Sequence, residues 1–121
     1  MKFKITALVL TLGLISGCSA IPSFYDDNES YIAAKIRLTV DEIDCNLPYK
    51  PQYEFLRSEV RFLELYSESK GSDDLYEMIQ PMQETIDGVL TKPNNKIYCQ
   101  MKKKFLTEQS ATITNALMER F

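Results

Sequence analysis

Apolar residues recur every three or four positions through four separate stretches of the chain, which is the spacing of one face of an α-helix. The clearest stripe lies within residues 73–90 and continues in phase through Pro81, so we expect a single helix kinked at this proline. No stretch shows the strict alternation that indicates a half-buried strand. The pattern predicts an all-α fold, a small bundle of about four antiparallel helices, over residues 28–45, 51–70, 73–90 and 95–120.

Each predicted helix carries an apolar stripe that we expect to face the core. The stripes are Ile32, Ile36, Val40 and Ile43; Leu56, Val60 and Leu63, widened by Phe55, Phe62 and Tyr66; Leu75, Met78, Ile79, Met82, Ile86 and Val89; and Ile97, Met101, Phe105, Ile113, Ala116 and Leu117. The polar residues 107–110 interrupt the last stripe, so we expect this helix to protrude or to pack against a partner over part of its length. We therefore predict partner binding by Phe105, Ile113 and Leu117, together with the exposed part of the helix at 51–70; packing of these residues in the bundle core is the alternative.

Capping residues mark the expected helix ends. Residues 26–28 offer an N-cap and negative charge at the start of the first helix, and Ser72 offers an N-cap for the third. Pro51 suits the first turn of the second helix, where its missing N–H is harmless. Gly71 can adopt the positive φ that ends many helices, so the second helix should end at Lys70.

The first 17 residues have the features of a secretory signal. Two lysines are followed by an apolar stretch over residues 5–15, which is too short to span a bilayer. The sequence Leu14-Ile15-Ser16-Gly17-Cys18 resembles a bacterial lipobox, which implies acylation of Cys18 and cleavage before it. Ser19 in place of Asp favours the outer membrane. The chain would then comprise a signal peptide (1–17), a lipidated N-terminus and tether (18–27) and a helical periplasmic domain (28–121); an ordinary signal peptide with Cys18 as a plain thiol is the alternative.

The chain has three cysteines, an odd number that needs an explanation in an exported protein. If Cys18 carries lipid, Cys45 and Cys99 remain as a pair in an oxidising compartment, and we expect them to form a disulfide. In an antiparallel bundle the first helix ends at the pole where the fourth begins, so the two residues can meet. The opposite pole would hold the tether and the C-terminus. Two free buried thiols are the alternative.

The amino-acid composition limits the kinds of binding and catalysis that the protein can perform. The 121 residues are 45% hydrophobic, which suits one globular domain, and the net charge of −3 argues against nucleic-acid binding. The absence of histidine excludes Ser-His-Asp and Cys-His catalysis and any histidine-ligated metal. Glu64 and Asp73 lie nine positions apart across a helix end, which loosely resembles a muramidase pair, but such acids on helices usually face solvent, and no threonine follows at the muramidase spacing. We expect no catalytic activity, no cofactor, no metal site and no small-molecule substrate. The lysines at 102–104 are expected to form a solvated face of their helix; binding to phospholipid head groups is the alternative.

Several short motifs are shared with a known group of proteins. They are residues 21–28 (IPSFYDDN), Asp44-Cys45, residues 65–71 (LYSESKG), Tyr98-Cys99 with Lys102-Lys103-Lys104, Gln109-Ser110 and Arg120-Phe121. Together they resemble the outer-membrane lipoprotein subunit of two-component spanins of tailed phages, in particular the helical type of large myophages. The resemblance extends over nearly the whole mature chain, and the chain departs from the short, Pro-rich outer spanins.

This resemblance implies a role in host lysis. The lipoprotein would sit in the inner leaflet of the Gram-negative outer membrane, face the periplasm and bind an inner-membrane spanin subunit. After endolysin removes the peptidoglycan, the complex would bring the two membranes together to fuse. The alternative is a small periplasmic lipoprotein that blocks a receptor or inhibits a host enzyme.

Overall fold

Four helices make up most of the part of the chain that the computed structural model describes, residues 25–120. They are α2 (Asp27–Asp41), α3 (Lys50–Lys70), α4 (Asp73–Thr91) and α5 (Lys96–Glu119). The predicted all-helical fold is therefore confirmed for this range. The predicted signal peptide, the lipidation site Cys18, most of the tether and Phe121 lie outside the described residues.

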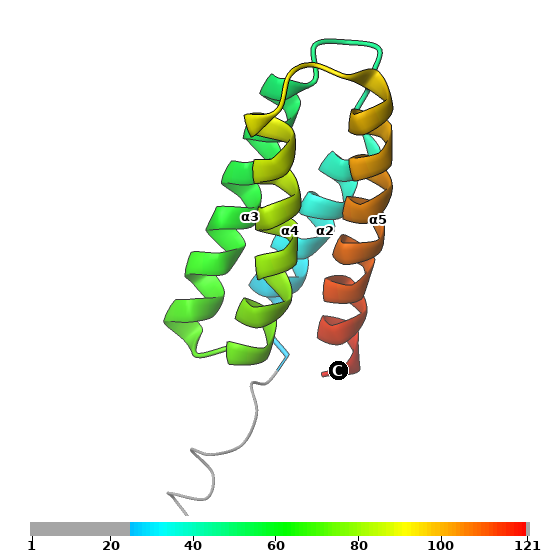
Figure 1. The fold of residues 1–121 in the computed structure, drawn as a ribbon. Helices are drawn as coiled ribbons and strands as arrows, with labels where there is room; N and C mark the ends of the chain where they lie inside the picture. The colour runs from blue at the N-terminus through cyan, green and yellow to red at the C-terminus, as the bar shows by residue number, and fades with distance from the viewer. Residues whose placement is uncertain (1–24, 121) are drawn as a thin grey trace, which may run out of the picture.

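The helices form a ring in which successive members run antiparallel (Figure 1). Each helix packs against two neighbours, in the order α2, α3, α4, α5 and back to α2, while the backbones of the diagonally opposite described helices lie farther apart. The α2–α3 and α4–α5 connections lie at one pole. The α3–α4 turn, the start of α2 and the end of α5 lie at the other (Figure 1). Among the described residues no helix is both long and apolar enough to cross a membrane.

The core lies along the axis of the ring. Its buried apolar side chains are Ala33, Ile36, Val40, Ile43, Tyr49, Tyr53, Leu56, Val60, Leu63, Leu75, Ile79, Met82, Ile86, Val89, Cys99, Leu106, Ile113 and Leu117. The stripes predicted for the first three helices contribute most of them. Phe55 and Phe62 are exceptions, because 60% and 59% of their surfaces are exposed.

The helix ends largely follow the capping residues. Asp26 caps α2, its carboxylate accepting the N–H groups of Asn28 at 2.7 Å and Glu29 at 3.1 Å. Gly71 ends α3 with a φ of 82°, a conformation that strains any residue with a side chain. Ser72 occupies the N-cap position of α4 without making the side-chain cap, since its hydroxyl donates to Glu29 instead. The α4 helix continues through Pro81, as predicted.

The expectation that the last helix protrudes from the bundle was wrong. Residues Cys99, Leu106, Ser110, Ile113 and Leu117 bury one face of α5 along almost its entire length, so the helix does not protrude. Ser110 can be buried because its hydroxyl donates to the carbonyl oxygen of Thr107 at 3.1 Å. The apolar residues of the first half of the predicted stripe lie on the opposite, exposed face.

Candidate functional site

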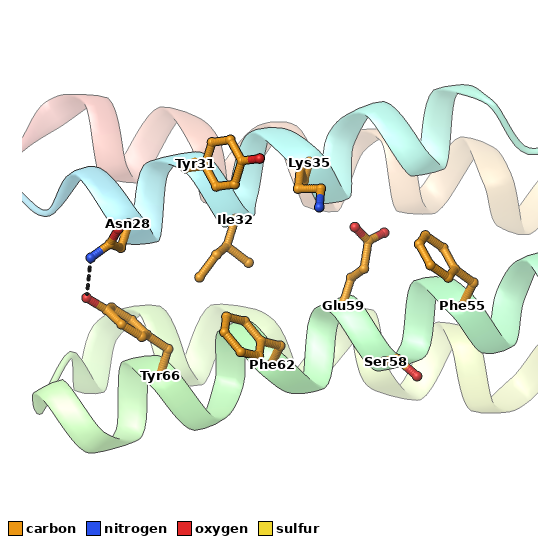
Figure 2. A pocket seen from close by; sticks show the side chains of 9 residues that line it. All are labelled: Asn28, Tyr31, Ile32, Lys35, Phe55, Ser58, Glu59, Phe62 and Tyr66. Atoms are coloured by element: carbon orange, nitrogen blue, oxygen red, sulfur yellow. Dashed lines mark hydrogen bonds between the residues drawn. The ribbon is translucent and has the colours of Figure 1, made fainter.

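A groove of about 570 Å³ runs between α2 and α3 on the outside of the bundle. Its lining residues, drawn in Figure 2, are Asn28, Tyr31, Ile32, Lys35, Phe55, Ser58, Glu59, Phe62 and Tyr66. Most of the lining surface is apolar. An apolar, partly aromatic groove on the surface of a small domain is typical of a protein-interaction site.

The side chains that α3 contributes have the spacing of a coiled-coil seam. Phe55, Glu59, Phe62 and Tyr66 are separated by four, three and four positions, the spacing of core positions in a heptad repeat. They form a second face of α3, beside the row that packs into the core. A helix that carries two such faces can pack against the bundle on one side and against a further helix on the other.

The groove has aromatic groups on both walls. Tyr31 on α2 is 65% exposed, close to the values for Phe55 and Phe62 on α3. Burial of one such phenylalanine under a partner would contribute about 2–3 kcal/mol, since an aromatic side chain buries 150–250 Å² when fully covered. Each of the exposed aromatic side chains in the groove would therefore contribute a substantial binding free energy when a partner covers it.

A charged pair lies in the middle of the groove. Lys35 and Glu59 point toward one another from opposite walls (Figure 2). The Oε1 atom of Glu59 is buried and has no hydrogen-bond partner within residues 25–120. An unpaired buried acceptor is costly, so an occupant that supplies a donor at this point gains binding energy.

One end of the groove is closed by a hydrogen bond at the pole where α2 begins. The side-chain amide of Asn28 donates to the Tyr66 hydroxyl at 3.1 Å (Figure 2). That hydroxyl in turn donates to the carboxylate of Asp26 at 3.2 Å. The groove thus starts beside residue 25 and extends toward the opposite pole.

Asp26 is held in its ionised form. Desolvation acts to raise the pKa of its carboxyl group, but the N–H groups of Glu29 and Asn28 act in the opposite direction. The hydroxyl of Tyr66 and the charge of Lys70 add to them, and the pKa falls below its ordinary value of 3.8. A fixed negative charge therefore marks the point where the described chain enters the bundle.

A buried charge cluster beside it was not anticipated from the sequence. Glu29 is fully buried, and its carboxylate accepts from Lys70 at 2.6 Å, Arg120 at 3.2 Å and Ser67 at 3.1 Å. The other guanidinium nitrogen of Arg120 bonds Asp74 at 2.5 Å. The cluster joins all four helices at this pole. Its members are too far apart in the sequence for any local pattern to reveal them.

The Arg120 contact also acts on Asp74. Desolvation opposes ionisation of Asp74, but the hydrogen bond from the guanidinium, the backbone N–H of Leu75 and the charge of Arg120 lower the net pKa below 3.8. The two acids at this pole, Asp26 and Asp74, are therefore both stabilised as carboxylates.

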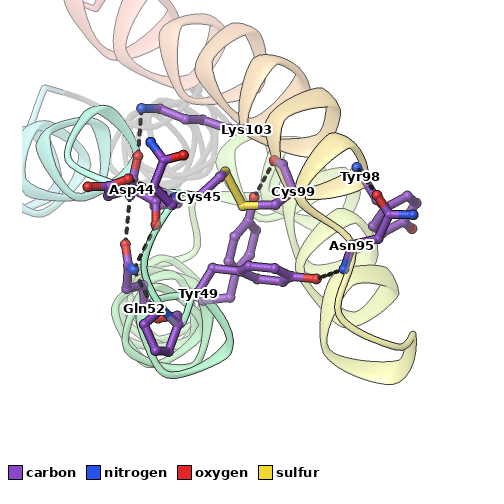
Figure 3. Close-up of a disulfide and its surroundings, with 12 residues drawn as sticks. Asp44, Cys45, Tyr49, Gln52, Asn95, Tyr98, Cys99 and Lys103 are labelled. Carbon is purple, nitrogen blue, oxygen red and sulfur yellow. Dashed lines mark hydrogen bonds between the residues drawn. A yellow bond between two sulfur atoms is a disulfide. The ribbon is translucent and has the colours of Figure 1, made fainter.

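The predicted disulfide between Cys45 and Cys99 is present and holds the opposite pole together (Figure 3). The Cα atoms are 5.9 Å apart and the residues are 54 positions apart in sequence. The α2 helix ends at Asp41, earlier than predicted, so Cys45 lies in the α2–α3 loop rather than in a helix. Both cysteines are used structurally.

Side-chain hydrogen bonds surround the disulfide. The Tyr49 hydroxyl accepts the N–H of Asn95 at 2.6 Å, and the Tyr53 hydroxyl donates to the carbonyl oxygen of Cys99 at 3.0 Å. Burial raises the pKa of Tyr53, so this hydroxyl stays protonated. Lys103 donates to the carbonyl oxygens of Asp41 at 3.0 Å and Ile43 at 2.7 Å, where a cation suits the C-terminal end of α2.

The three residues predicted to bind a partner are separated by the fold. Phe105 is 43% exposed, whereas Ile113 and Leu117 are core residues with 2% and 1% exposure. A partner cannot reach Ile113 or Leu117 while the bundle is closed, and the assignment of these two to a contact surface is wrong for this structure. The sequence did indicate the exposed part of the helix at 51–70, without identifying Phe55 and Phe62 as exposed.

The carboxylates considered for catalysis have other roles. Glu64 is 5% exposed and bonds Arg61 and Gln80, the latter at 3.2 Å. Asp73 lies in the first turn of α4, where a negative charge is favourable. Within residues 25–120 no group of three or more Cys, Asp or Glu side chains is arranged to hold a metal ion.

Comparison of the chain with protein-family models, with curated proteins and with solved structures finds no match.

Proposed function

We propose that this chain is the outer-membrane lipoprotein subunit of a phage spanin complex, and that the α2–α3 groove binds a helix of its inner-membrane partner. The groove carries the proposal, because its α3 wall has heptad spacing and its aromatic side chains are exposed. The lipobox-like sequence ending at Cys18 and the spanin-like motifs along the chain support the same assignment.

The proposed occupant is an amphipathic helix. Its apolar positions would follow a heptad repeat and pack between Phe55 and Phe62 on one side and Tyr31 on the other. A lysine or arginine near the middle would donate to the unpaired oxygen of Glu59. Because the groove is parallel to the bundle axis, the bound helix would extend along the bundle and away from the lipid-bearing end (Figures 1 and 2).

In this arrangement the two poles have different tasks. The chain enters the bundle at Asp26, so acyl chains on Cys18 would hold this pole close to the outer membrane. The partner helix, bound in the groove, would lead toward the inner membrane. Further burial of apolar surface between the subunits, at about 25 cal/mol per Å², would supply energy to draw the membranes together.

The first test is complementation of a phage from which the gene is deleted. We expect the deletion phage to leave spherical, unlysed cells when divalent cations stabilise the envelope, and the wild-type chain to restore lysis. A chain with Phe55→Ser and Phe62→Ser should accumulate normally and fail to restore it. The matched control is Leu38→Ser with Leu65→Ser, since these residues are 56% and 46% exposed but lie outside the groove.

Normal lysis by the deletion phage would reject the spanin function. Normal lysis by the groove variant alone would reject the groove as the partner site. If the deletion phage lyses normally while cells that express the chain resist infection, the receptor-blocking alternative is correct. A neighbouring or embedded gene for an inner-membrane protein with a periplasmic coiled coil would further favour the spanin assignment.

The second test addresses the anchor. We expect Cys18→Ser to move the protein from the membrane fraction to the soluble periplasmic fraction. Mass spectrometry of the wild-type protein should show acyl groups on an N-terminus that begins at Cys18. An unmodified N-terminus would overturn the lipoprotein assignment.

A further inference from the structure

The first half of α5 is apolar on two opposite faces. Cys99 and Leu106 face the core, while Ile97, Met101 and Phe105 lie on the outer face with 76%, 46% and 43% of their surfaces exposed. The last three are spaced by four residues and thus form one stripe along the outside of the helix. No described helix covers this stripe, since α5 contacts α2 and α4 with its other side.

Positive charge is concentrated around this stripe, although the exposed Glu108 follows Phe105 by three positions on the same side of the helix. Residues 88–107 contain five lysines and no acidic residue, although the chain as a whole carries a net charge of −3. Lys92 and Lys102 place their ammonium groups 4.9 and 5.2 Å from the centre of the Tyr98 ring, and Lys102 also lies 5.2 Å from that of Phe105. The positive charge is therefore held close to exposed aromatic surface.

The remaining lysines differ in their surroundings. Lys103 is engaged with backbone carbonyl groups at the end of α2 and is half-buried. Lys96 and Lys104 are exposed and flank the stripe along the helix. An apolar centre with exposed ammonium groups beside it is the arrangement by which amphipathic helices bind anionic lipid surfaces.

The stripe lies at the pole away from the start of the described chain. The start of α2 and the far end of α5 lie at the same pole (Figure 1), and the contact between Arg120 and Glu29 joins them. The 24 residues of α5 span about 36 Å, so the stripe lies roughly a helix length from residue 25. When the bundle stands upright on the membrane that holds the N-terminal end, the stripe is held away from that membrane and can meet a second one.

We propose that the outer face of α5 formed by Ile97, Met101 and Phe105, with Lys92, Lys96, Lys102 and Lys104, docks on the surface of an anionic phospholipid bilayer opposite the anchoring membrane. The apolar side chains enter the head-group region, and the ammonium groups meet the lipid phosphates. The combination of clustered ammonium groups with exposed apolar side chains on one helix face suits an anionic bilayer. The biological setting of this contact rests on the proposed function, but the contact itself is testable with lipids alone.

The experiment measures docking between two populations of vesicles. The full-length chain is inserted from detergent into preformed neutral phosphatidylcholine vesicles. Its N-terminal region anchors it in these vesicles. Fluorescent vesicles that contain 30% phosphatidylglycerol are then added, and their capture is measured at low and high salt. We expect capture that needs both the protein and phosphatidylglycerol and that is lost at high salt.

Two variants locate the contact. With Lys96→Gln and Lys104→Gln, we expect roughly 25-fold weaker capture, because each lysine near an anionic surface contributes about fivefold. With Met101→Ser and Phe105→Ser, capture should fall at least tenfold through loss of the apolar contact. The matched control is Arg37→Gln with Arg57→Gln, which removes the same charge from exposed positions of α2 and α3 outside the groove and should change capture less than about twofold. Circular dichroism and the intact disulfide verify the fold of each variant.

The outcomes separate this contact from the proposed function. Absence of capture, equal capture of neutral vesicles, or equal weakening by the Arg37 and Arg57 control would overturn the membrane contact. Loss of capture in a variant that still restores phage lysis would show that lysis does not use it and would leave the spanin proposal intact. Strong capture by a chain whose deletion leaves lysis unaffected would reject the spanin function and retain the membrane contact.

Discussion

Arg120 donates to the carboxylate of Glu29 at 3.2 Å, across 91 positions of sequence, and thereby joins the last turn of α5 to the first turn of α2. Glu29 is fully buried, and Lys70 is its second cation at 2.6 Å. Removal of one partner from a buried, hydrogen-bonded ion cluster is strongly destabilising, because the remaining charges stay desolvated. The stability of this pole of the bundle therefore depends on the Glu29 carboxylate.

We predict that Glu29→Ala lowers the free energy of unfolding by roughly 3–5 kcal/mol, as measured by urea denaturation. Arg120→Ala should be destabilising in the same direction and less costly, since Lys70 still neutralises the carboxylate. The control is Glu119→Ala, an exposed neighbour on α5, which should shift stability by less than about 0.5 kcal/mol. Equal effects of Glu29→Ala and Glu119→Ala would contradict a stabilising role for the cluster.

The lowered pKa values of Asp26 and Asp74 give stability a dependence on acid. Each carboxyl group binds protons less readily in the folded than in the unfolded state, so its contribution is complete above the unfolded value of about 3.8. That contribution is lost as the pH falls through the lower folded pKa. We expect Asp26→Asn and Asp74→Asn to lower the urea midpoint at pH 7, and we expect this effect to diminish as the pH falls below about 3.8. An undiminished effect at the lower pH would refute the electrostatic origin.

The disulfide should account for much of the thermal stability. Closing a loop between residues 54 positions apart reduces the entropy of the unfolded chain, worth roughly 4 kcal/mol in the chain-entropy model. We predict that Cys45→Ala with Cys99→Ala lowers the melting temperature, and that reductant lowers that of the wild type but not that of the variant. If the oxidised wild type and the variant had the same melting temperature, the stabilising role of the disulfide would be refuted.

Substitution of two adjacent residues of α3 should distinguish side chains that stabilise the fold from side chains available for binding a partner. Leu63 is fully buried whereas Phe62 is 59% exposed in the groove. Leu63→Ala should therefore cost 2–5 kcal/mol in urea denaturation, through lost burial and the cavity left behind. Phe62→Ala should cost less than about 0.5 kcal/mol, since it leaves no cavity in the core. A large loss of stability in the Phe62 variant would mean that this side chain supports the fold rather than a partner.

Much of the fold follows from local sequence signals. Asp26 and Gly71 set the start of α2 and the end of α3 as their side-chain chemistry predicts. The stripe in α4 identifies its buried residues because all its large apolar side chains fall on one face. The short connections then place Cys45 and Cys99 at one pole, where the disulfide forms.

The pattern fails where a helix is apolar on two faces. In α5 the exposed residues Ile97, Met101 and Phe105 form a more regular apolar row than the buried face, which includes Ser110 and contains no large apolar side chain between Cys99 and Leu106. In α3 the groove residues Phe55 and Phe62 lie beside the core row, and the hydrophobic pattern does not separate them from it. Hydrophobicity alone does not distinguish a core face from a binding face, and only the positions of neighbouring helices do so.

The disulfide has a mechanical consequence. Tension applied at residue 25 and resisted at residue 120 would travel along α2, across the Cys45–Cys99 bond and along α5. Residues 46–98 lie within the loop that this bond closes, so the hairpin of α3 and α4 is bypassed. Under this tension the ionic contacts of Glu29 would break first. The α2 helix would then separate from its neighbours only as far as the Cys45–Cys99 disulfide. The wall of the groove that carries Phe55 and Phe62 would thus stay folded while the chain on either side of it is stretched.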